Sequence, residues 1–172
     1  MTRTEQPDRE RADLVESLNR QRFFLRNTLR GLTDEQAAQR STASELSLAG
    51  LIKHVAMAER QWAEFIVHGP SAMSGSDEQA MAAWMAGFHM AEGETVEGLF
   101  AAYDDVARST DELLRELPDL DAEQPLPEAP WFQPGARWSA RRVVLHVIAE
   151  IAQHAGHADI IRESIDGAKS MG

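Results

Sequence analysis

Apolar residues recur at helical spacing along most of the chain. In the first forty residues, leucines three, four or seven positions apart predict a helix over roughly residues 9–30. These leucines are Leu14, Leu18, Leu25, Leu29 and Leu32. The same spacing predicts a helix from Ser47 to about Val67 and another that begins at Thr95, and each starts at a hydroxyl residue able to cap it. No stretch alternates apolar and polar residues clearly enough to predict a β-strand.

The longest predicted helix runs from Ser139 to Asp166. Ser139 is a favourable N-cap, and Gly167 follows the last turn, where glycine commonly ends a helix. No proline interrupts this stretch, and Gly156 is its one interior glycine. Its apolar positions, Val143, Val147, Ile151, Ala158, Ile161 and Ile165, give it a face to bury. Four long helices joined by shorter pieces predict an all-α fold, a four-helix bundle with additional short helices.

The connections between these helices differ in character. A capping box at Thr33–Gln36 predicts a short helix to about Arg40. Residues 70–94 form a long excursion, flexible by composition over 71–76 and with a possible short helix over 79–85.

The connection over residues 118–138 holds five of the seven prolines together with Trp131, Phe132 and Trp138. A connection this long in a compact domain is usually functional or disordered. Its aromatic residues favour a packed loop at the wall of a pocket. The expected organisation is a disordered N-terminus over 1–8, one domain over 9–167 and a flexible C-terminus over 168–172.

Composition narrows the classes of function. A net charge of −11 argues against nucleic acid as a partner, because the phosphate backbone must be neutralised by Lys and Arg. The sequence contains no apolar run long enough for a membrane span, and its polar N-terminus lacks a signal core, so a cytoplasmic location is expected. The chain has no cysteine, which excludes disulfides, zinc–thiolate sites and a thiol nucleophile of its own. Sulfur chemistry would therefore need a bound thiol.

Four potential metal ligands share one stripe of the last predicted helix. His146, Glu150, His154 and His157 fall within an arc of roughly 80° on a regular helix. Burying such groups is costly unless they find partners, and a divalent metal would satisfy several at once. Glu150 and His154 stand one turn apart, and His54, on the edge of the core stripe of an earlier helix, is the candidate third ligand. Two histidines and one carboxylate leave coordination positions open, as in catalytic sites, and suit Zn²⁺, Ni²⁺ or Fe²⁺.

Simpler interpretations stand beside this one. In the first of these, the four residues are ordinary helix residues that bind no metal, with Glu150 in a salt bridge and the histidines at a solvated edge. By geometry alone His146 is equivalent to His154 as the partner of Glu150. His68 and His89 are expected in exposed loop regions. Trp62 and Tyr103 are most simply core residues.

Three segments carry a resemblance to a known family. The last helix, H-V-I-A-E-I-A-Q-H-A-G-H-A-D-I-I-R-E over 146–163, resembles the last-helix signature of the DinB/YfiT-like superfamily, and most of all its mycothiol transferase branch. L-A-G-L-I-K-H-V-A-M-A-E-R-Q-W over 48–62 and G-E-T-V-E-G-L-F-A-A-Y over 93–103 resemble the second and third helices of that branch. The match in order and spacing covers about residues 10–166.

The resemblance implies a bundle whose metal is held by His54, Glu150 and His154. It implies an S-transferase that uses a low-molecular-weight thiol such as mycothiol, and a homodimer. Many relatives have His where Glu150 stands, and an Arg-Gly-Gln-like tripeptide where this chain has Ala155-Gly156-His157. His157 is therefore interpreted as a proton relay or a fourth ligand. The alternatives are a stress-response or interaction protein with a non-catalytic metal, and a metal-dependent hydrolase.

Overall fold

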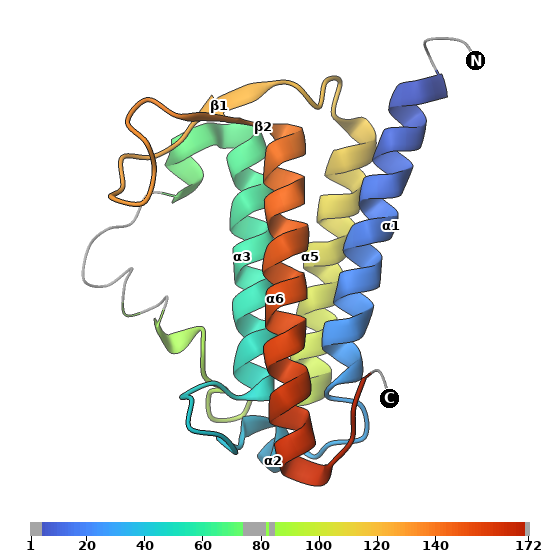
Figure 1. Cartoon of the computed structure of the whole chain (residues 1–172), viewed down its shortest axis with the longest axis vertical. Coiled ribbons are helices and arrows are strands. Elements are labelled where there is room, and N and C mark those ends of the chain that lie inside the picture. Colours follow the sequence, from blue (N-terminus) through green and yellow to red (C-terminus); the bar gives the residue numbers. More distant parts are fainter. Residues whose placement is uncertain (1–4, 74–81, 83–84, 171–172) are drawn as a thin grey trace.

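Four long helices lie side by side and make up most of the molecule (Figure 1). The fold is that of a computed structural model, which describes residues 5–73, 82 and 85–170. The helices are α1 (Glu5–Asn27), α3 (Leu48–His68), α5 (Val96–Glu116) and α6 (Ala140–Asp166). Helix α6 packs against α1 and α3, and α3 also packs against α5. The predicted all-α four-helix bundle with additional short helices is confirmed.

Local signals in the sequence set where the helices begin and end. The hydroxyls of Ser47, Thr95 and Ser139 each accept a hydrogen bond from a backbone N–H of the first turn that follows, as predicted. At the other end of α6, Gly167 adopts the left-handed conformation with φ of 77°. The short helix α2 (Asp34–Ala38) opens with the predicted capping box at Thr33.

Some elements differ from the prediction. Helix α1 begins at Glu5, before the predicted start at residue 9. Pro7 is compatible with this start because it falls in the first turn, where a missing N–H breaks no helical hydrogen bond. A short 3₁₀ helix, η1 (Gly69–Met73), follows α3. The short helix predicted over 79–85 falls largely outside the described residues.

The proline-rich connection contains a small antiparallel pair of strands that the sequence did not predict. Strand β1 (Glu123–Pro125) pairs with β2 (Arg137–Ser139), with Gln124 opposite Trp138. Strands of three residues are too short to show an alternating pattern, which explains the omission. The pair brings Trp138 directly to the start of α6.

The core lies between the four helices and is mostly aliphatic, with Phe65 and Tyr103 among its largest fully buried side chains. Burying one such side chain contributes roughly 1.5–3 kcal/mol. It also contains a buried ion pair in which Arg22 of α1 donates to Glu59 of α3 and to Asp111 of α5, the latter at 2.8 Å. This network ties three helices together. No helix among the described residues is long and apolar enough to cross a membrane.

Candidate metal centre

The packing of α3 against α6 brings together His54, Glu150 and His154. Each offers one ligand atom, and the three atoms lie within 4.8 Å of one another. Nε2 of His54 is 3.4 Å from Oε1 of Glu150, and Nε2 of His154 is 3.2 Å from the same oxygen. His54 is buried, whereas the side chain of Glu150 is 27% exposed and keeps the cluster accessible to a small ligand.

Glu150 supplies the negative charge of this cluster. Hydrogen bonds from His154 and His54 hold the pKa of Glu150 far below its usual range, although partial burial acts in the opposite direction. The carboxylate is therefore ionised at neutral pH. An anionic oxygen between two imidazole nitrogens is a favourable set of donors for a divalent cation.

The spacing of the donors fits a metal. Two ligands bound about 2.1 Å from a tetrahedral Zn²⁺ lie about 3.4 Å from each other. The distances from Glu150 to His54 and to His154 are close to this value. Nδ1 of His154 is buried and has no hydrogen-bond partner in the part of the chain that the structure describes. When Nε2 of His154 binds a metal, the ring proton is carried by Nδ1.

Phe88 forms one side of the centre. Its ring stacks on the imidazole of His54, with centroids 4.2 Å apart and planes at 19°. The backbone of Phe88 comes so close to α3 that a Cβ on Gly50 would lie 1.9 Å from its carbonyl oxygen. Lys53 anchors the same segment through an ion pair of 2.8 Å with Glu94. The segment that precedes α5 thus fixes the orientation of His54.

The other histidines of the α6 stripe lie beside the cluster. The half-buried ring of His157 meets the ring of His154 edge to face, with centroids 5.5 Å apart. His146 instead packs against Trp62 at 4.7 Å and Trp138 at 5.2 Å, and burial lowers the pKa of His146. The three mutually close donors therefore include His154 and not His146.

The two remaining histidines lie outside the cluster of donors. His68 is the exposed last residue of α3, at a helix end rather than in a loop. His89 is half-buried, and its Nδ1 lies 3.4 Å from a guanidinium nitrogen of Arg40.

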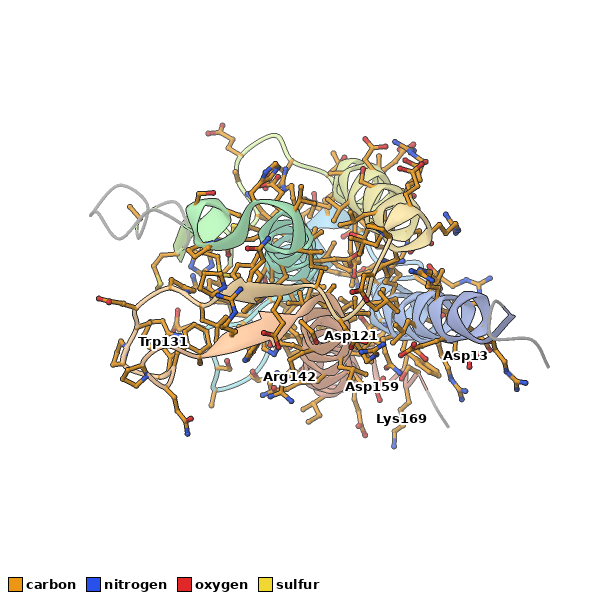
Figure 2. The ribbon with its side chains drawn as sticks, turned by 90° about the horizontal axis from the view of Figure 1, so that it is seen from above. Asp13, Asp121, Trp131, Arg142, Asp159 and Lys169 are labelled. Atoms are coloured by element: carbon orange, nitrogen blue, oxygen red, sulfur yellow. The ribbon has the colours of Figure 1, made fainter. Side chains whose placement is uncertain are left out.

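The aromatic residues of the proline-rich connection divide into a packed and an exposed part. Trp138 stacks on Trp62 at 5.1 Å, and Phe132 meets Trp138 edge to face. Trp131 is 77% exposed on a loop outside the group of helices (Figure 2). The expected packed loop is present, and through His146 it adjoins the helix face that carries the donors.

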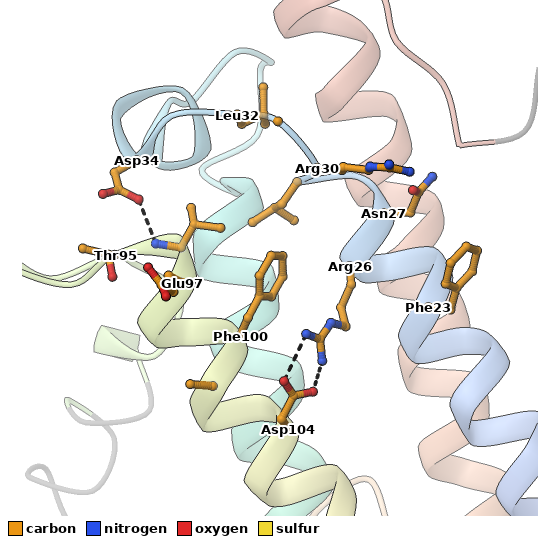
Figure 3. A pocket seen from close by; sticks show the side chains of 14 residues that line it. Phe23, Arg26, Asn27, Arg30, Leu32, Asp34, Thr95, Glu97, Phe100 and Asp104 are labelled. Carbon is orange, nitrogen blue, oxygen red and sulfur yellow. Dashed lines mark hydrogen bonds and ion pairs between the residues drawn. The ribbon is translucent and has the colours of Figure 1, made fainter.

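A groove of about 850 Å³ lies elsewhere, between α1 and α5 (Figure 3). Arg26 spans it, donating to Asp104 and lying over the ring of Phe100 at 4.7 Å. At its end the backbone N–H of Val96 donates to Asp34 at 2.8 Å. None of the three donors lines this groove, so it is separate from the candidate centre.

Sequence reasoning missed two features of the core and the centre. Phe88 gave no signal, because its stacking on His54 depends on how residues 85–94 return to α3. The buried pair of Arg22 and Glu59 could have been found from the sequence. Arg22 lies between the core residues Leu18 and Leu25 on the first helix. Glu59 falls four residues after the core residue Val55 on the next long helix. A charged residue within each of two apolar stripes predicts a buried ion pair between the helices.

Fold and centre together define a four-helix bundle with a His/Glu/His cluster between two of its helices, the architecture expected of the DinB-like class. A family model of mycothiol S-transferases matches residues 13–167. The chain belongs to the mycothiol S-transferase family. No curated protein shows a significant match to the sequence. No solved structure matches it significantly either.

Proposed function

We propose that this protein is a metal-dependent S-transferase that uses a low-molecular-weight thiol, mycothiol or a close analogue. The observation that carries the proposal is the set of three donors, His54, Glu150 and His154, within 4.8 Å of one another. Family membership supports the choice of thiol. Zn²⁺ is the first choice of metal, with Ni²⁺ or Fe²⁺ as alternatives that the same donors suit. A cytoplasmic location and a homodimer belong to the same proposal.

In this proposal the three side chains hold the metal and leave positions open for a substrate. A divalent cation lowers the pKa of a bound thiol and so supplies thiolate at neutral pH. The chain has no thiol of its own, so the sulfur must come from the cosubstrate. His157 would accept the thiol proton, because its ring lies beside His154 and its buried Nδ1 has no hydrogen-bond partner among the described residues.

The electrophile would approach between the two segments that border the centre. Phe88 stacks on His54, and the group of Trp62, Trp138 and His146 lies further along the two helices, with Trp62 two turns beyond His54 and His146 one turn before Glu150. Both borders are aromatic, which favours electrophiles with apolar surface.

Hydrolysis is the alternative that the same geometry supports, because open metal positions also accept water. The experiment is metal analysis of the purified protein followed by turnover of a generic aryl halide with mycothiol, with other thiols and without thiol. We expect bound metal, turnover only with thiol present, and loss of turnover on chelation. Turnover without thiol would indicate a hydrolase. A protein with metal but no turnover of either kind would contradict the enzyme proposal.

A further inference from the structure

The outer face of α6 carries an exposed apolar stripe. Leu145 is 50% exposed and Ile160 is 64% exposed, so two large aliphatic side chains of α6 face solvent. Between them the exposed residues of the same face are small. The stripe consists of Leu145, Ala149, Ala152, Gly156 and Ile160, all within an arc of roughly 80°. Arg142 and Asp159 lie on the side of α6 turned away from the other helices (Figure 2).

Packing among the residues that the structure describes does not explain why position 156 is a glycine. Apart from the backbone of its own helix, a Cβ built on it would meet no atom of the described residues within 4 Å, so an alanine would fit. Glycine in a helix interior costs about 1 kcal/mol relative to alanine. A glycine and two alanines in the middle of a stripe allow a second helix to approach closely, which places their backbones near the 8 Å end of the usual interaxial range of about 8–10 Å.

The face is complementary to itself in the antiparallel direction. Leu145 and Ile160 are equally distant from the point between Ala152 and Gln153, and so are Ala149 and Gly156, whereas Ala152 itself would face the partner's Gln153. In a contact related by a two-fold axis, residue i of the first copy faces residue j of the second, and residue j of the first copy faces residue i of the second. Leu145 would then face the partner's Ile160, and Ala149 the partner's Gly156.

The charges at the two ends of the face follow the same symmetry. Arg142 and Glu163 are equally distant from the centre, so each Arg142 would face the partner's Glu163. Both residues are exposed, and Glu163, which already contacts Lys169 at 3.1 Å, is half exposed and can accept a second cation. The stripe residues and Gln153 between these ends are uncharged. An uncharged centre with charges at the rim is the usual composition of an interface.

We propose that this face of α6 is the interface of a homodimer, in which α6 packs antiparallel against α6 of a second copy. A second copy is favoured over another protein because the aliphatic ends of the stripe, the small residues Ala149 and Gly156, and the charged pair of Arg142 and Glu163 match under one two-fold axis. Glu150 and His154 lie about 120–160° around the helix from the stripe, so the interface leaves the candidate metal centre uncovered. The interface deepens the homodimer of the proposed function, while its position does not depend on the metal chemistry or on the reaction.

A charge exchange tests the rim of the interface. The mass of the full-length protein is measured by sedimentation across a range of concentrations for wild type, Arg142→Glu, Glu163→Arg and the double variant. Each single reversal should weaken dimerisation about tenfold or more, because it places like charges opposite each other. The double variant should restore it. A monomeric wild type, or a dimer that neither single reversal weakens, would overturn the proposal.

A cross-link tests the centre and does not depend on the charges. Since the chain has no cysteine, Ala152→Cys introduces a single thiol next to the proposed axis. Disulfides form when Cα atoms are about 4.4–6.8 Å apart, so this variant should oxidise to a covalent dimer. Ala101→Cys, on an exposed position of α5, is the matched control and should stay monomeric under the same conditions. Equal cross-linking of the two variants, or none at Ala152→Cys while the protein is dimeric, would place the interface elsewhere.

Discussion

At the scale of single residues, the centre depends on one carboxylate shared by two imidazoles. Glu150 keeps its charge because His154 and His54 both lie at hydrogen-bonding distance from the same oxygen. The spacing of Glu150 and His154 on one helix could be predicted from the sequence. Their distance to His54 could not, because it depends on how α3 and α6 are rotated against each other. The resemblance, rather than the spacing, singled out His154 over His146, whereas the place of His54 on the edge of a core stripe had already made it the candidate third ligand.

Two substitutions distinguish the proposed role of His154 from that of His157. His154→Ala should lose metal and turnover together, because it removes a proposed ligand. His157→Ala should keep the metal but lose turnover by about 10²–10⁴-fold, as expected when a proton relay is removed from an intact site. Metal content and rate are measured on both proteins. Equal loss of metal in the two would make His157 a fourth ligand, and full activity of His157→Ala would leave it a packing residue.

The single tyrosine of the chain reports on the core. Burial, with the negative charge of Glu59 as the next cause, raises the pKa of Tyr103 well above its ordinary value. A raised pKa in the folded state means that this contribution to stability is complete below the unfolded pKa of about 10 and is lost as the pH rises beyond it. The absorbance change of tyrosine ionisation should therefore occur well above pH 10 in the native protein, together with unfolding. The urea-unfolded chain is the control and should titrate near pH 10. Ionisation near pH 10 with the helical signal intact would show that Tyr103 is accessible.

At the scale of elements, the sequence predicted what local signals determine. Ser47, Thr95 and Ser139 cap the helices where expected, because each hydroxyl serves a backbone N–H a few residues away. The β1–β2 pair was not predicted, because three-residue strands are held by a partner distant in sequence rather than by their own pattern. The segment bearing Phe88 was read only as part of a long connection, yet it packs its backbone directly on α3.

Two glycine-to-alanine substitutions should have opposite effects on stability. Gly50→Ala forces its Cβ against the carbonyl oxygen of Phe88, so it should lower the melting temperature and displace the ring from His54. Gly156→Ala meets no atom of another described element and should raise the free energy of unfolding of the monomer by about 0.5–1 kcal/mol, because alanine favours the helix.

Thermal unfolding is measured for both variants at concentrations where the chain is monomeric, together with metal affinity. Gly50→Ala should also bind metal more weakly than wild type, because Phe88 no longer orients the imidazole of His54. A Gly50→Ala protein as stable as wild type and with unchanged metal affinity would show that residues 85–94 do not support the centre.

At the scale of the whole molecule, the bundle holds itself together without the centre. The aliphatic core and the network of Arg22, Glu59 and Asp111 link α1, α3 and α5. The cluster of donors joins only α3 and α6, which already pack through apolar residues. A metal would therefore stabilise a fold that exists without it.

Removal of the metal should lower the melting temperature without abolishing the helical fold. A ligand that binds only the native state stabilises it by RT ln(1 + [L]/Kd), which is about 2.7 kcal/mol at a hundredfold excess over Kd. Circular dichroism and thermal melts of the metal-loaded and chelated protein measure this difference. His154→Ala is the matched control, and its melting temperature should not respond to the chelator because the site has lost a ligand. Complete unfolding on chelation would make the metal a structural element and would argue against an open, reactive centre, whereas an equal response of His154→Ala would place the stabilising metal at another site.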